Sequence, residues 1–216
     1  MESLEEIKAR VEASVTGAAV EIVPNDAPCQ QRSLRVGREK AREVAEFLRD
    51  DPRLRLDYAS NATGVDWPDT VTKQKVKVKK QINGVEQEVE ETLEERKPGC
   101  LEAVYHLYSM ALKQGPVILR VRTADRMQGV HLPSLTPVWR GAEFQEREIY
   151  DLYGIVFDGH PDLRRLLMWE GYRHHPMRKD FVEPDDYEYE PTPHDEVLEK
   201  AKAHYPADGG TQGGTA

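Results

Sequence analysis

The segments LEAVYHLY (residues 101–108) and VILRVR (residues 117–122) decide the fold of this chain. From Val117 onward, aliphatic residues at alternate positions face one way and arginines the other, a pattern typical of a strand with one buried face. We therefore expect two strands at the centre of a sheet. His106 lies among aromatic residues in the first segment, and we interpret it as a satisfied packing residue rather than a ligand.

A charged hairpin precedes these strands. Residues 73–82 alternate valine with lysine, residues 85–93 return with alternating glutamates, and Asn83-Gly84 between them favours a two-residue turn. We interpret residues 73–93 as a solvated hairpin held by cross-strand pairs, and a partner-docking arm is the alternative. The turn sets a register in which charged pairs share one face and aliphatic pairs the other: Lys79 with Glu88, Lys77 with Glu90, Val78 with Val89, and Ile82 with Val85.

Helices and short strands alternate through the first part of the chain. Ser3 and Glu6 form a capping-box pattern for a first helix, and apolar residues recur at helical spacing between positions 41 and 48. Residues 18–23 and 33–36 have the composition of short strands. This order predicts an α+β fold in two layers, with helices packed on one face of a mostly antiparallel sheet.

Two further stretches carry local signals. Residues 54–66 are typical of a strand followed by a loop, and Asp66-Trp67-Pro68 indicates a fixed turn. Thr136-Pro137 has the pattern of an N-cap and a first helical residue, so we expect a helix over about 136–153, closed by Gly154. Three residues at successive i+4 steps of this helix predict a ladder of ion pairs: Glu143, Arg147 and Asp151.

Composition excludes several classes of protein. The chain has 216 residues and a formal net charge of −9, the wrong sign for binding nucleic-acid phosphates. Cys29 and Cys100 are its two cysteines, too few for an iron–sulfur cluster or a structural zinc site in this chain alone. Neither a secretory signal pattern nor an apolar run long enough to span a bilayer occurs, so we expect a cytoplasmic protein.

Residues 146–181 hold the densest mixture of charged, aromatic, glycine and His-Pro residues. One hypothesis is a free-standing enzyme whose site uses His160, Asp162 and Asp180, and a metal site could add His174 and His175 to these residues. The histidines lack the spacing that places two ligands on one face. Arginines beside aromatic residues are the composition of binding hot spots. We therefore favour a partner-docking segment over a reaction centre.

The stretch EREIYDLYGIVFDGHPDLRRLL (residues 146–167), followed by HPMRKDF (residues 175–181), resembles the signature of the 30 kDa (C-type) subunit of proton-translocating NADH:quinone oxidoreductase, respiratory complex I. ATGVDWP (residues 62–68) and EAVYHLYS (residues 102–109) are also similar to family segments. The resemblance assigns these signature residues to a partner interface: Glu146, Arg147, Glu148, Asp151, Gly154, His160, Pro161, Asp162, Arg164, Arg178, Lys179 and Asp180.

The resemblance implies a peripheral-arm subunit with no catalytic, metal or cofactor-binding residues of its own. In such a complex, FMN and Fe-S clusters in other subunits carry electrons from NADH to quinone, coupled to proton translocation. The expected partner is the adjacent D-type subunit, which helps form the quinone pocket. Membrane association would be indirect, on the cytoplasmic side of the bacterial inner membrane. The equivalent subunit of a related membrane-bound hydrogenase-type complex is the alternative.

Three regions follow from these patterns. We expect an α+β domain over residues 1–153, an extended partner-docking arm over residues 154–199, and a flexible tail over residues 200–216. His174 stands where the family signature has a glycine, so the backbone there cannot copy a conformation that only glycine reaches easily.

Overall fold

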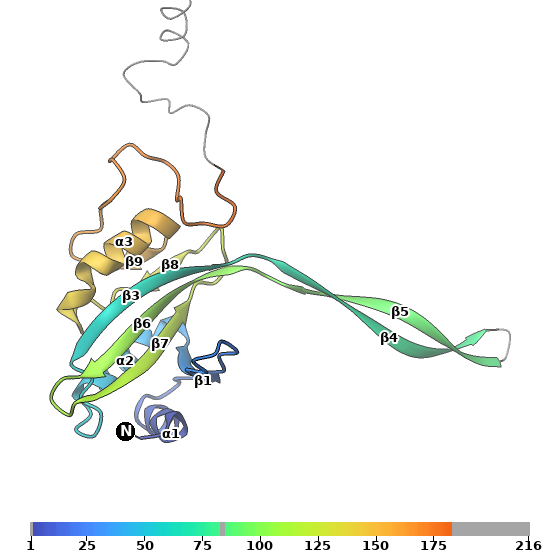
Figure 1. Cartoon of the computed structure of the whole chain (residues 1–216), viewed down its shortest axis with the longest axis horizontal. Coiled ribbons are helices and arrows are strands. Elements are labelled where there is room, and N and C mark those ends of the chain that lie inside the picture. Colours follow the sequence, from blue (N-terminus) through green and yellow to red (C-terminus); the bar gives the residue numbers. More distant parts are fainter. Residues whose placement is uncertain (1, 83–84, 183–216) are drawn as a thin grey trace, which may run out of the picture. The chain divides into compact units, whose positions relative to one another are not determined.

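The computed structural model describes the backbone of residues 2–82 and 85–182 (Figure 1). Side chains are described for the same residues, except those at positions 73–93 and 95. Within these residues the elements follow in this order: α1 (Leu4–Ser14), β1 (Val20–Val23), β2 (Ser33–Val36), η1 (Arg38–Lys40), α2 (Ala41–Asp50), β3 (Tyr58–Trp67), β4 (Thr70–Ile82), β5 (Val85–Lys97), β6 (Cys100–Ser109), β7 (Gln114–Arg122), β8 (His131–Pro133), η2 (Arg140–Ala142), α3 (Glu143–Tyr153) and β9 (Val156–Asp158).

A five-stranded sheet forms the centre of the domain, in the order β1-β2-β7-β6-β3. Neighbouring strands are antiparallel except β2 and β7, which are parallel. The mixed α+β class and the mostly antiparallel sheet are as predicted. The two strands expected at the centre, now β6 and β7, are both interior strands (Figure 1). They place Tyr105 opposite Leu119.

The core lies against one set of alternating side chains of this sheet. Tyr105 and Leu119 are buried there together with Ile7 of α1, Leu48 of α2 and Ile149 of α3. Burial of each large apolar side chain contributes about 1.5–3 kcal/mol relative to exposure. The capping box predicted for α1 is present, because Ser3 Oγ accepts from the Glu6 amide and the Glu6 carboxylate accepts from the Ser3 amide.

Among the described strands, β4 and β5 of the charged hairpin form a separate two-stranded sheet. Its strands cover residues 70–82 and 85–97 and are therefore longer than predicted. The predicted register is confirmed, since Lys79 lies opposite Glu88 and Ile82 opposite Val85. The turn predicted at positions 83–84 is outside the described residues.

One loop prediction was wrong. Residues 62–67 continue strand β3 instead of forming a loop and a fixed turn, because Asp66 and Trp67 pair with Leu101 and Cys100 of β6. Leu54, expected in a strand, lies in the turn after α2 and is buried. Sequence patterns cannot show that a neighbouring strand extends far enough to prolong a pairing.

The predicted start of the last helix was also wrong. α3 begins at Glu143, not near residue 136, and the short turn η2 precedes it. Thr136 does not cap this helix, because its hydroxyl donates to the Glu146 carboxylate. The end at Gly154 is confirmed, and this residue has the left-handed φ of +82° that favours glycine.

Residues 154–181 belong to the same compact unit as the α+β domain. β9 lies within this segment and pairs in parallel with β8. Residues 183–199 of the expected arm, and the whole expected tail, lie outside the described residues. Within the described part of the chain, no helix is long and apolar enough to cross a membrane.

Candidate functional site

Glu146, the first residue of the signature, is fully buried on α3. Its carboxylate accepts hydrogen bonds from Tyr105 Oη at 3.0 Å, Ser134 Oγ at 2.6 Å, the Leu135 amide at 2.8 Å and Thr136 Oγ1 at 3.1 Å. Burial raises the pKa of this carboxyl above its ordinary value, although the four donors oppose the shift. Glu146 therefore ties α3 to β6 and to the segment before η2.

Arg147 lies on another face of α3 and is only 4% exposed. Its guanidinium donates from Nε to the carbonyl of Arg164 and from Nη2 to the carbonyl of Arg165, both at 3.2 Å. The guanidinium also stacks over the Phe144 ring, 5.4 Å from its centroid. Arg147 thus holds the backbone of the segment that follows β9.

Asp151 binds the backbone amides of the next residues of the same segment. One carboxylate oxygen accepts from the amides of Leu166, Leu167 and Met168 at 3.0, 2.7 and 2.8 Å, and the other accepts from Arg165 Nη1 at 2.6 Å. Burial opposes ionisation of Asp151, but the amides and the guanidinium outweigh it and hold its pKa below the ordinary value. The side chain is fully buried, so this charge acts as a fixed anchor for the backbone.

The ladder of ion pairs predicted along α3 does not form. Glu143 pairs with Arg140 at 2.9 Å, whereas Arg147 and Asp151 bind residues 164–168. An exposed ion pair at i,i+4 spacing stabilises a helix by only about 0.3–0.5 kcal/mol. Hydrogen bonds from charged groups to a buried backbone are stronger and take precedence.

The two histidines nearest this segment bond to backbone groups. His160 Nδ1 accepts from the Asp162 amide at 3.1 Å, so its Nε2 carries the proton and donates to the Glu143 carbonyl at 2.9 Å. His175 Nδ1 lies 3.0 Å from the Asp151 carbonyl, which can only accept, and burial lowers the pKa of this imidazole. Both rings therefore serve as connectors within the fold.

The last signature residues form a second cluster at the end of β3. Asp66 is paired in bidentate fashion with Arg126 at 2.6 and 2.7 Å, and it accepts from the Lys179 amide at 2.7 Å. Asp180 bonds to Arg126 at 2.9 Å and to Arg178 at 3.3 Å. Burial opposes ionisation of Asp66, but Arg126 and the Lys179 amide hold its pKa below the ordinary value.

The structure does not assemble the rival catalytic or metal constellation. His160 and Asp162 are joined through the backbone, while Asp180 lies in the cluster with Arg126. Among the described residues, no three His, Cys, Asp or Glu side chains are arranged to hold a metal ion. His106 is not fully satisfied as predicted, because its buried Nδ1 has no hydrogen-bond partner within the part of the chain that is described.

Several side chains of the segment stay exposed although its backbone is fixed. Leu167 is 58% exposed and Met177 is 54% exposed, and Phe144 on α3 is 60% exposed. The Arg164 side chain is 65% exposed and bonds to Asp162, which is itself half exposed. Glu148, Pro161 and Lys179 are also exposed signature residues.

Sequence reasoning missed the inward partners of the signature. Asp66 was identified only as part of a turn and of a similar family segment. Nothing in the local pattern marked Arg126 as the partner of Asp66 or Tyr105 as a partner of Glu146. Phe144 and Leu167 were missed as outward apolar residues. No local pattern separated these two residues from apolar residues that face the core.

Comparison with known proteins gives consistent matches. The sequence model described as "Respiratory-chain NADH dehydrogenase, 30 Kd subunit" matches residues 34–187. The chain is 39% identical over 145 residues to a C-type subunit of NADH-quinone oxidoreductase from Rhizobium meliloti, covering 66% of this chain and 62% of that protein. It is also 39% identical over 148 residues to the C-type subunit from Roseiflexus castenholzii, covering 68% of each. The match thus spans about three fifths of the Rhizobium relative's length.

A solved structure shares the fold. It is a chain of the membrane-bound sulfane sulfur reductase, described as an archaeal respiratory membrane complex. The TM-score is 0.54 at 19% identity, covering 98% of this chain and 97% of that chain. At this level of identity the likeness shows the fold alone.

Proposed function

Because the chain belongs to the family of the respiratory-chain NADH dehydrogenase 30 kDa subunit, we propose that it serves as the 30 kDa (C-type) subunit of an NADH:quinone oxidoreductase. The whole complex would carry electrons from NADH through FMN and Fe-S clusters in other subunits to quinone, coupled to proton translocation. This chain would contribute a scaffold and a binding surface rather than chemistry. It would reach the cytoplasmic side of the bacterial inner membrane through its partners.

The observation that carries this proposal is the anchoring of residues 164–168 by two buried side chains of α3. Arg147 holds two carbonyls of this segment and Asp151 holds three amides, so its backbone is fixed before any partner arrives. A preorganised segment binds with a smaller loss of conformational entropy. The exposed Leu167 is therefore well suited to act as an apolar anchor on a partner surface.

The signature residues divide into two roles within this proposal. Those with inward partners shape the surface, and the exposed ones contact the partner, which we infer to be the D-type subunit beside the quinone pocket. The shaping residues are Glu146, Arg147, Asp151, Gly154, His160, Arg178 and Asp180; the contacting residues are Glu148, Pro161, Asp162, Arg164 and Lys179. We also propose that the helices cover one face of the sheet and that the docking arm extends through residue 199.

Purification from native membranes tests the proposal. In a strain whose tagged chain carries Leu167→Asp, co-purification of the complex should fall steeply, because a charge would replace the apolar side chain that the partner surface would bury. Loss of about 2 kcal/mol at a hot spot weakens binding about 30-fold. Met110→Asp is the matched control, since Met110 is 65% exposed in the turn after β6.

The outcomes separate the possibilities. Full retention of the partner subunits by Leu167→Asp would contradict the proposed surface. Both variants should melt at the temperature of the unmodified protein, because neither side chain is buried in the isolated chain. An NADH-oxidising flavin subunit among the co-purified chains would support complex I over the hydrogenase-type complex.

A further inference from the structure

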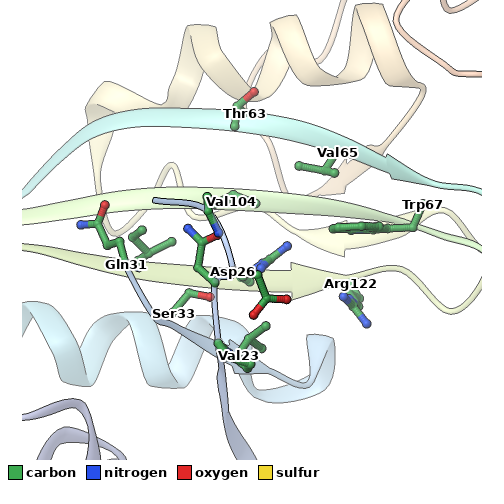
Figure 2. Close-up of a pocket in the computed structure, with 14 residues that line it drawn as sticks. Val23, Asp26, Gln31, Ser33, Thr63, Val65, Trp67, Val104 and Arg122 are labelled. Carbon is green, nitrogen blue, oxygen red and sulfur yellow. The ribbon is translucent and has the colours of Figure 1, made fainter. Parts of the chain in front are cut away.

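The sheet has a second face that the core does not cover, and a cavity of about 520 Å³ lies on it. Val65 of β3, Val104 of β6 and Ile118 of β7 form its aliphatic floor. Figure 2 shows the segment after β1 crossing the sheet beside the cavity, with Asp26 on it. In the same view Trp67 and Arg122 lie at one end and Gln31 at the other. The cavity is therefore a groove across three strands.

Positive charge gathers at one end of this groove. The guanidinium groups of Arg120 and Arg122 each lie 5.8 Å from the centre of the Trp67 ring, and Lys179 Nζ lies 5.9 Å from it. The buried carboxylate of Glu102 bonds to Arg120, to Arg122 at 2.9 Å and to the Trp67 indole at 2.9 Å. Two guanidinium groups thus share the buried Glu102 carboxylate beside a third cation, and Asp26 is the other carboxylate among the described residues that line the groove. Cations therefore outnumber carboxylates at this end, on a chain whose net charge is −9.

An unused hydrogen-bond donor also lines the groove. Nε of Arg120 is buried and has no hydrogen-bond partner within the described residues. Buried donors in folded proteins are nearly always paired, and an unpaired one calls for an explanation such as a missing acceptor. Because Nε is buried, a carboxylate or a backbone carbonyl in the groove would supply that acceptor through a shift of the Arg120 side chain.

We propose that this groove binds an extended, acidic segment of a partner subunit that also carries aliphatic residues. Its aliphatic side chains would pack on the partly exposed Val65, above the buried Val104 and Ile118. A carboxylate would pair with Arg122, whose side chain is 34% exposed. The proposal rests on the proposed function, because it requires the chain to be part of a complex. The binding surface is on strands β3, β6 and β7, so it is distinct from the segment anchored by α3.

Site-specific photo-cross-linking in the intact complex tests the groove. A diazirine amino acid replaces Thr63, which lines the groove and is half-buried. A second strain carries it at Leu167 to report on the α3 segment, and a third carries it at Arg42, an exposed position on α2. After irradiation of native membranes, the tagged chain is purified and its cross-linked peptides are sequenced.

The expected product at position 63 is a peptide of another subunit that contains both Asp or Glu and aliphatic residues. Arg122→Gln in the same strain should lower this yield about tenfold, because the charge pair at the interface is lost. Arg42→Gln is the matched control and should leave the yield unchanged. Glu102 keeps Arg120 and the Trp67 indole as partners in Arg122→Gln, and a melting curve of the isolated variant checks the fold.

Three results would overturn the proposal: cross-linking only within this chain, a partner peptide without acidic residues, or no product at position 63. If position 63 gives no partner product but position 167 cross-links to a partner, the groove fails while the subunit function stands. Absence of products at both 63 and 167, in a chain that does not co-purify with other subunits, would count against the proposed function itself.

Discussion

Two buried carboxylates on α3 have pKa values shifted in opposite directions. Glu146 has four neutral donors, and burial raises its pKa. Asp151 has three amides of one segment and a guanidinium, which together lower its pKa despite burial. Glu146 lies deeper in the fold, and only Asp151 has a cation and three backbone amides among its partners.

Replacement of Asp151 by asparagine should destabilise the isolated subunit by about 3 kcal/mol, because it leaves Arg165 without its counter-charge in a buried site. Thermal or denaturant unfolding measures this change. Asp162→Asn is the control, since Asp162 is half exposed and its ion pair with Arg164 is screened by solvent, so the change in stability should be far smaller. Equal effects of the two substitutions would show that the anchor contributes nothing beyond a surface pair.

Glu146 and the two aspartates should contribute to the pH dependence of stability in opposite directions. The lowered pKa values of Asp66 and Asp151 give stability that is present above about pH 4 and lost as pH falls through their folded-state values. The raised pKa of Glu146 acts the other way, because its ionisation in the folded state costs free energy as pH rises above its ordinary value.

Glu146→Gln isolates this second effect. The free energy of unfolding of the variant, relative to the unmodified chain, should increase as pH rises above about 4.5 and level off once pH passes the folded-state pKa of Glu146, since the amide does not ionise. Urea unfolding at several pH values provides the measurement. A difference that stays constant with pH would show that Glu146 titrates as it does in the unfolded chain.

At the scale of the element, α3 joins two parts of the fold. Ile149 packs into the core, and Arg147 and Asp151 hold residues 164–168. The helix ends where the chain must turn sharply, and the His175 ring lies against that end. This close approach explains why the end of the helix requires glycine.

Gly154→Ala should destabilise the subunit by about 1–3 kcal/mol through its φ of +82°, with an additional loss because a Cβ would lie 2.7 Å from His175 Nε2. Gly159→Ala is the matched control. Its φ is +79°, but no atom lies within 4 Å of the added Cβ, so only the backbone strain applies. Melting curves of the two variants should therefore differ, and identical losses would exclude a contribution from the imidazole.

The hairpin of β4 and β5 can be tested as an element. It forms a separate two-stranded sheet, and the strands that flank it already pair through Trp67 and Cys100. Replacement of residues 70–97 by a short glycine–serine turn should change the stability of the remaining domain by no more than about 1 kcal/mol. Co-purification from membranes then distinguishes a solvated hairpin, which assembly does not require, from a docking arm, which it does.

At the scale of the whole molecule, the described chain presents two different surfaces to its surroundings. One is the anchored segment with exposed Leu167, and the other is the cationic groove beside Trp67. The cluster of Asp66, Arg126 and Asp180 lies between β3 and the last described residues, so it fixes the chain near the groove. A subunit with two such surfaces is suited to hold neighbours rather than to act alone.

The sequence by itself determined the features that depend on local backbone geometry. Strand alternation located β6 and β7, the Asn-Gly step set the register of Lys79 and Glu88, and Gly154 marked the end of a helix. The signature in residues 146–181 was also sufficient to identify the family, which the comparisons show independently.

Only the tertiary structure decided the partners of the charged residues. The i+4 spacing predicted that Arg147 would pair along its own helix, but its partners are the carbonyls of positions 164 and 165. Asp66 and Arg126 are 60 positions apart in the chain and form a bidentate pair. Periodicity reports which side of an element is buried, whereas the strongest partner of a buried charge is set by which distant backbone and side-chain groups the fold brings within hydrogen-bond distance.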